Sequence, residues 1–158
     1  MTDPVPAAPD AAAPAQQLAE ALDDVEQQFA ALYSNAQRGL RRRAAAVHPE
    51  LLVTGYRLLG VLSHRGALQQ VEIAELLELD KAVVSRTVKQ LEELGLVGRT
   101  PDPHDGRASR VALSPEADER LRSVNEHERA ALRTKLSDWH PDEIGNLAAL
   151  LARLNEPA

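Results

Sequence analysis

The sequence contains no cysteine and few aromatic residues. Without cysteine the chain can form no disulfide framework, no thiolate metal site and no thiol redox switch. Only 3% of its 158 residues are aromatic while 44% are apolar, so the core must be built largely from leucine, valine and alanine. Such a core is more typical of packed helices than of sheets, and the composition therefore predicts a mainly helical domain.

Long apolar runs are also missing. No run approaches the roughly 18 residues that a helix needs to cross a bilayer. The first residues, MTDPVPAAPDAAAPA, lack the basic and apolar segments of a signal peptide and are rich in proline and alanine. We therefore expect a soluble cytoplasmic protein with no membrane partner, in which residues 1–14 form a disordered tail.

The acidic total conceals an uneven distribution of charge. The net charge of −6 argues against indiscriminate binding of nucleic acid. Residues 81–110, however, hold six basic and four acidic side chains, a net charge of +2, so the rest of the chain carries −8. This local excess is compatible with a face that attracts a polyanion, and equally with a mixed, solvated surface.

Apolar spacing predicts long helices at both ends of the chain. Over residues 15–46 apolar side chains recur every three or four positions from Leu18 to Leu40, a seam that resembles a coiled coil. A helix expected to begin at Ser114 carries a similar stripe as far as Trp139, and a last helix opens at Pro141. Together these stripes offer more apolar surface than one small domain can cover.

The middle of the chain has the pattern of a winged helix-turn-helix. The expected elements are a buried helix that starts at His48-Pro49 and closes at Gly66, a short helix over residues 70–77, a second helix from its N-cap Asp80 to Gly95, and a hairpin of strands 97–100 and 110–113. Glu78 stands in the turn between the two short helices. Because glutamate has a Cβ atom and rarely adopts a positive φ, the turn must use a right-handed or bridge conformation there, or accept strain.

The second short helix has two distinct faces. Its apolar stripe, which is expected to pack inward, consists of Val84, Val88, Leu91 and Leu94. Small, hydroxylic and basic side chains occupy the other faces, and these types suit close approach to a major groove, phosphate contact and guanine recognition. The candidate DNA-binding residues on this helix are Lys81, Ala82, Ser85, Arg86 and Lys89.

The run EIAELLELDKAVVSRTVKQLEELGLVGR, followed by DGR and VALS, resembles the MarR family of bacterial winged-helix transcriptional regulators. The resemblance covers residues 16–156. It implies a mainly α fold with a small β-hairpin wing, in which the winged helix-turn-helix of residues 48–113 lies between dimerisation helices at 15–47 and 114–158. It further implies a homodimer that binds a pseudo-palindromic operator in double-stranded DNA, most often as a repressor.

The resemblance also assigns roles to the wing. The arginine of the family's Asp-x-Arg motif, here Arg107, reaches the minor groove and is held by the aspartate that begins the recognition helix, here Asp80. Asp105 is the first residue of the same motif and orients the wing with Asp80. For Arg110, at the start of the second strand, we expect a phosphate contact.

Many relatives in this family bind small, often aromatic anions that release DNA. In this sequence the candidates for lining such a ligand pocket are His48, Tyr56, Arg57 and Arg65. The histidines show no paired helical spacing, so no metal site is expected, and nothing in the sequence points to a cofactor.

Two other classes of function fit the sequence less well. An enzyme would need an activated nucleophile, a glycine-rich phosphate loop or a metal triad, and the sequence contains none of these motifs. We therefore expect no catalytic residues. The alternative that stays open is a winged-helix scaffold that binds proteins without specific DNA binding.

Overall fold

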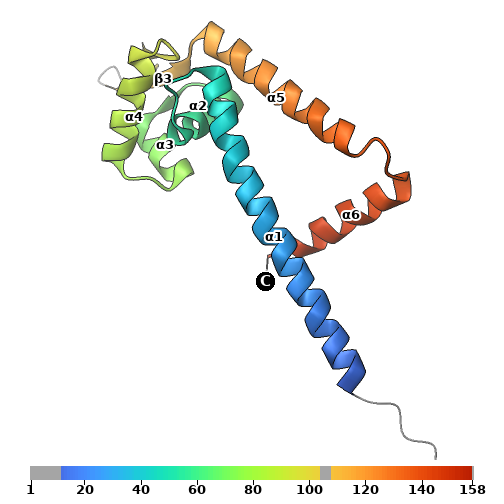
Figure 1. Cartoon of the computed structure of the whole chain (residues 1–158). Coiled ribbons are helices and arrows are strands. Elements are labelled where there is room, and N and C mark those ends of the chain that lie inside the picture. The colour runs from blue at the N-terminus through green and yellow to red at the C-terminus, as the bar shows by residue number, and fades with distance from the viewer. Residues whose placement is uncertain (1–11, 104–107, 158) are drawn as a thin grey trace, which may run out of the picture. The chain divides into compact units, whose positions relative to one another are not determined.

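The computed structural model describes residues 12–103 and 108–157. The helices are α1 (Ala12–Val47), α2 (Val53–Arg65), α3 (Gln70–Leu77), α4 (Lys81–Glu93), α5 (Pro115–Lys135) and α6 (Pro141–Leu154), and the strands are β1 (Leu68–Gln69), β2 (Val97–Pro101) and β3 (Ser109–Leu113) (Figure 1). The predicted fold class, mainly helical with a small β wing behind a helix-turn-helix, is confirmed.

The chain divides into two compact units, Met1–Arg42 and Arg43–Ala158. In the first unit α1 begins at Ala12, three residues before the predicted start, and the rest of the predicted tail lies outside the described residues. The seam of α1 is exposed. Its side chains Leu18, Leu22, Val25, Phe29 and Leu32 keep between 43% and 62% of their surface accessible.

The core of the second unit lies between α2, α3, α4 and the sheet, and is closed by α5. Its fully buried side chains include Leu58 and Leu59 of α2, Ile73 of α3, Val84, Val88 and Leu91 of α4, Val111 of β3 and Leu121 of α5. The predicted inner stripe of α4 is therefore confirmed, except that Leu94 at the helix end is only half-buried. Close packing of α4 on α2 uses Gly55, where a Cβ atom would lie 3.2 Å from Leu91 Cδ2.

The sheet has three antiparallel strands in the order β1-β3-β2, rather than the two that the sequence predicted. β2 and β3 form the expected hairpin, each one residue longer than predicted, with Val97 opposite Leu113. β1 adds Leu68 opposite Val111 and Gln69 opposite Arg110. Two residues are too few to show the alternation that marks a strand, which explains why β1 was not predicted.

Pro49 separates α1 from α2, so the prediction that α2 starts at His48-Pro49 is wrong. α1 runs to Val47, and α2 begins at Val53. In the turn between them His48 Nδ1 accepts a hydrogen bond from the backbone N–H of Glu50 at 3.2 Å. Proline disfavours a helical backbone at the preceding residue and offers no N–H of its own, which ends α1 at this point.

The helix that begins after Ser114 ends earlier than predicted. Leu136 and Trp139 were expected on the helix that carries Leu121, but α5 ends at Lys135 and both residues lie in the turn before α6. The predicted starts are confirmed: the Ser114 hydroxyl accepts from the backbone N–H of Ala117 at 3.2 Å, and His140 is the N-cap of α6.

The helix-turn-helix turn contains one strained residue. Glu78 has φ 53° and ψ 46°, the left-handed region, and it is the one non-glycine residue of positive φ in the described ranges. Of the two alternatives for this turn, strain is therefore the correct one, at a cost of roughly 1–2 kcal/mol for a residue with a Cβ atom. Backbone N–H groups hold the conformation, since Leu79 donates to the Ala74 carbonyl at 2.9 Å.

We expect Glu78→Gly to raise the free energy of unfolding by about 0.5–1 kcal/mol, because relief of the left-handed strain exceeds the entropic cost of glycine. Urea unfolding followed by circular dichroism measures the change. The matched control is Glu75→Gly, which removes the same charge from the interior of α3 and should lower stability by about 1 kcal/mol. Equal destabilisation by both variants would contradict the assignment of strain to Glu78.

Candidate nucleic-acid interface

The outer surface of α4 carries all five candidate residues that were predicted on this helix. Lys81, Ala82, Ser85, Arg86 and Lys89 are each exposed. The helical period places Ala82, Ser85, Arg86 and Lys89 within two turns of one another, opposite the buried stripe. The outer surface of α4 thus combines a small residue, a hydroxyl and basic groups, which are the side chains that phosphates and guanine edges can bind.

Arg86 is free to bind a ligand. Within the described part of the chain its guanidinium forms no hydrogen bond and no ion pair, and the residue lines one hollow with Leu52 and Thr54 from the start of α2. Lys89 is nearly free, because its Nζ approaches Glu93 only to 4.0 Å and both side chains are largely exposed. An exposed pair of this kind contributes little, so both cations remain available.

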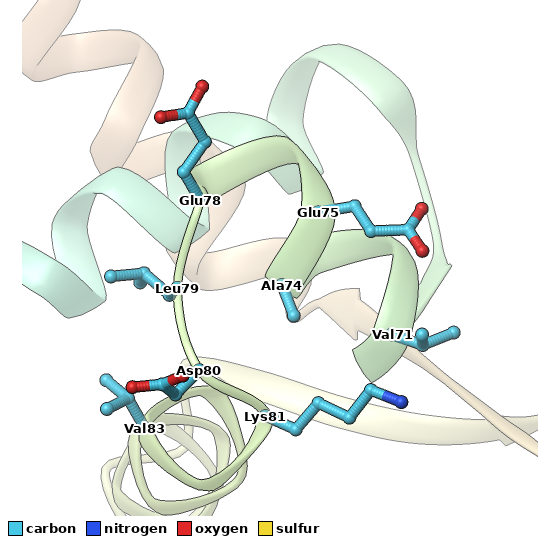
Figure 2. A pocket seen from close by; sticks show the side chains of 8 residues that line it. All are labelled: Val71, Ala74, Glu75, Glu78, Leu79, Asp80, Lys81 and Val83. Atoms are coloured by element: carbon cyan, nitrogen blue, oxygen red, sulfur yellow. The ribbon is translucent and has the colours of Figure 1, made fainter.

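A hollow beside the first turn of α4 is lined in part by acidic residues. This hollow of about 480 Å³ between α3 and α4 has apolar walls that include Ala74 and Leu79, and its rim carries Glu75, Glu78, Asp80 and Lys81 (Figure 2). In Figure 2 the carboxylates of Glu75 and Glu78 are directed away from the start of α4. Three acids beside one lysine repel a polyanion, which favours approach along the side of Arg86 and Lys89.

Asp80 occupies the N-cap position of α4 as predicted, but its side chain makes no capping hydrogen bond. Its predicted partner Arg107 lies outside the described residues, as does Asp105. The assignment of Arg107 to the minor groove, and of Asp80 and Asp105 to orienting it, therefore stays a prediction.

Arg110 does not project from the wing as a free cation. Its Nε lies 2.7 Å from Oδ2 of Asp102, and this contact with the carboxylate raises the pKa of Arg110 further above its usual value. A second nitrogen donates to the Ala67 carbonyl at 3.3 Å. A phosphate contact of Arg110 must therefore compete with these internal bonds. Asp102, which was not predicted as a site residue, is the ion-pair partner of Arg110.

A second arginine of the wing is also paired. Arg99 Nε lies 2.7 Å from Glu92 Oε1, and a further nitrogen lies 3.3 Å from Oε2 of the same carboxylate. This two-point contact joins β2 to the end of α4 and neutralises both charges. Of the basic side chains of α4 and the two strands of the wing that the structure describes, those without a close acidic partner thus lie on α4.

The four predicted pocket residues do not all line one hollow. Arg57 and Arg65 line one hollow of about 420 Å³, along with Gly60, Val61, His64, Leu76 and Leu77. His48 belongs to the turn before α2. Tyr56 is buried with Arg43 6.0 Å from the centre of its ring, and burial raises the pKa of its phenol. His64, which also lines this hollow, was not among the predicted pocket residues; its Nδ1 lies 2.7 Å from the Gly60 carbonyl, and its Nε2 forms no hydrogen bond within the described residues.

No helix within residues 12–103 and 108–157 is both long and apolar enough to cross a membrane. The same residues contain no group of three or more histidine or acidic side chains that could hold a metal ion.

Known proteins resemble this chain in sequence and in fold. Residues 51–108 match the model of the MarR family. YdgJ, an uncharacterized HTH-type transcriptional regulator of Bacillus subtilis, is 31% identical over 97 residues, which cover 61% of this chain and 59% of YdgJ. MdtR, an HTH-type transcriptional repressor of the same organism, is 29% identical over 136 residues, covering 80% of this chain and 88% of MdtR.

A solved structure agrees with these sequence matches. A MarR family protein from Bacillus stearothermophilus shares the fold with a TM-score of 0.71, at 23% identity, over 85% of this chain and 93% of that one. The family model matches the part of the chain that contains α2, the helix-turn-helix and β2, where the exposed basic side of α4 lies. Residues 51–108 thus match the MarR family, and the chain resembles regulators of that family in sequence and in fold.

Proposed function

We propose that this regulator binds a specific sequence in duplex DNA as a homodimer and represses transcription. The observation that carries the proposal is the outer surface of α4, where Arg86 is exposed and unpaired among the described residues while the opposite stripe is fully buried. A major groove admits one helix, and an arginine on its outer face can bind guanine O6 and N7 with two hydrogen bonds. MdtR, which resembles this chain over most of its length, is named as a repressor.

The homodimer is supported by apolar side chains that a single chain leaves exposed. None of the residues of α6 is buried, and its side chains Ile144, Leu147, Leu150, Leu151 and Leu154 keep 36% to 60% of their surface accessible. The seam of α1 is exposed in the same way. Exposed stripes of this extent mark protein interfaces. We assign residues 15–47 and 114–158 to a two-fold dimer, whose recognition helices would lie ~34 Å apart on a pseudo-palindromic operator.

We further propose that a small organic anion releases the DNA, and that it binds in the hollow beside α2. Every titratable side chain that lines this hollow is basic, namely Arg57, His64 and Arg65, while Val61, Leu76 and Leu77 supply apolar walls. Ligand sites commonly combine such walls with a few polar groups. A ligand that favours the released state by ~3 kcal/mol would lower operator affinity by about two orders of magnitude.

The decisive experiment is selection of bound sequences from a random pool of duplex DNA by the full chain. The proposal expects an enriched motif with two inverted half-sites about 10 base pairs apart, and affinity that falls steeply as salt rises. A single half-site would contradict the dimer. No enrichment over random duplex would contradict specific DNA binding and favour the protein-binding scaffold.

A further inference from the structure

Asp102 is a buried carboxylate at the end of β2. Its side chain is 1% exposed, and Oδ2 accepts hydrogen bonds from Arg110 Nε at 2.7 Å and from Gln69 Nε2 at 2.9 Å. The strand register explains the first contact, because Arg110 pairs with Thr100 and Asp102 lies diagonally across, two residues further on. A carboxylate in such a position stays charged only if partners compensate for its lost hydration.

Gln69 connects this carboxylate to the helix-turn-helix. Its backbone pairs with Arg110 in the sheet, and it is also the N-cap of α3, where its N–H donates to Glu72 Oε2 at 2.7 Å. Arg110 adds a bond to the carbonyl of Ala67, just before β1. We call the three side chains of Gln69, Asp102 and Arg110 the wing latch; they join the base of the wing to the first residue before α3.

The wing latch also lies where the wing loop leaves the sheet. The backbone N–H of Asp102 donates to the Ala108 carbonyl at 3.0 Å, so the two stems of the loop are held together next to the buried carboxylate. Beyond α3 the chain passes through the turn at Glu78 directly into α4. The bonds of the wing latch therefore act on the distance and orientation between the wing and the recognition helix.

We propose that the wing latch is a positioning element for DNA binding. It fixes the position of the wing relative to α4, while none of its three side chains contacts DNA. The inference rests on the proposed DNA binding. It differs from the phosphate contact first expected of Arg110. The two assignments predict opposite changes in DNA affinity for the substitution Asp102→Asn. Asp102→Asn removes a negative charge, so simple electrostatics predicts tighter binding of a polyanion, whereas loss of the latch predicts weaker binding.

The test measures operator affinity by fluorescence anisotropy over a range of salt concentrations, with the operator selected as above. We expect Asp102→Asn and Arg110→Gln each to weaken binding at least tenfold, and the double variant to bind no more weakly than the weaker single variant. The salt dependence should stay that of wild type, because no phosphate contact is lost. The control is Glu50→Gln, which removes one exposed negative charge from the turn between α1 and α2, outside the wing and the proposed dimer helices, and should bind as wild type.

Three results would overturn the proposal. The first is wild-type or tighter binding by Asp102→Asn together with a salt slope reduced by about one in Arg110→Gln, which would make Arg110 a direct phosphate contact. The second is full binding by Arg110→Lys, which keeps the charge but cannot reproduce the Nε–H bond and the second donor. The third is a loss of affinity no larger than the loss of folded protein seen by circular dichroism.

Amide hydrogen exchange separates this inference from the proposed function. In Asp102→Asn and Arg110→Gln the amide of residue 102 should exchange at least tenfold faster, while core amides such as that of Leu59 stay protected. Unchanged protection at residue 102 would overturn the latch even if the wild type binds DNA. A wild type that binds no operator, with exchange as expected, would instead reject the proposed DNA binding.

Discussion

Replacing Arg86 with alanine is expected to weaken operator binding by about 5- to 150-fold, equivalent to ~1–3 kcal/mol, and to relax the base preference at one position of each half-site. Arg86 is exposed on the outer surface of α4 and makes no bond with the described residues, so its loss should leave the fold intact. A bidentate contact to guanine would be lost without a replacement, because alanine has no donor.

Selection of bound sequences with Arg86→Ala, compared with wild type, measures this effect. Lys89→Ala is the matched comparison one turn further along α4, since an ammonium group is better suited to a phosphate than to bidentate base recognition. We expect Lys89→Ala to weaken binding to all sequences alike and to reduce the salt dependence. An unchanged motif in Arg86→Ala would reject base recognition by Arg86 and leave it a phosphate contact at most.

Leu91→Ala is expected to lower the free energy of unfolding by about 2–5 kcal/mol, the largest effect on stability among these variants. Leu91 is fully buried on the inner face of α4 and packs against the backbone of α2 at Gly55. A cavity formed there cannot be filled by the residue across from it, because glycine has no side chain. The recognition helix would lose its main support on α2.

Urea unfolding measures the change, and the control is Leu76→Ala on α3. Leu76 is 46% exposed, so the same truncation should cost less than 1 kcal/mol. Operator binding by the folded fraction of Leu91→Ala should also weaken, since a poorly supported α4 loses its orientation. If Leu91→Ala lowered the free energy of unfolding as little as Leu76→Ala, the result would contradict the close packing of Leu91 between α4 and α2.

Much of the interface follows from helical periodicity. The inner stripe Val84, Val88 and Leu91 and the outward Arg86 were predicted from spacing, because side chains three or four positions apart share a face of any helix. Their burial and exposure in the structure agree. Tyr56 shows the limit of such reasoning: it was grouped with Arg57 as a pocket residue, but consecutive residues face different directions, and Tyr56 turns into the core.

Tertiary contacts changed the interpretation of charged residues. Arg110 was expected to be free, yet it bonds to a buried aspartate eight positions earlier in the chain. Arg57 and Arg65 share a hollow because the end of α3 supplies its opposite wall. Glu78 adopts a left-handed backbone although glycine would do so without strain, because bonds to the end of α3 and the packing of α4 hold it there.

The starts of α3, α4, α5 and α6, the periodic faces of the helices and the order of elements depend on residues within about one turn of each other, and these could be predicted without a structure. The start of α2 could not, because the turn at Pro49 delays it to Val53. Proline at 115 and 141 and glycine at 66 and 95 act through their own backbone restrictions. The partner of Arg110, the third strand and the strain at Glu78 depend instead on strand register and on packing across the core. Strand register and core packing are set by many residues that are distant in the sequence. The partner of a charged side chain and the torsion of a strained residue are those of the conformation that gives the whole domain its lowest free energy.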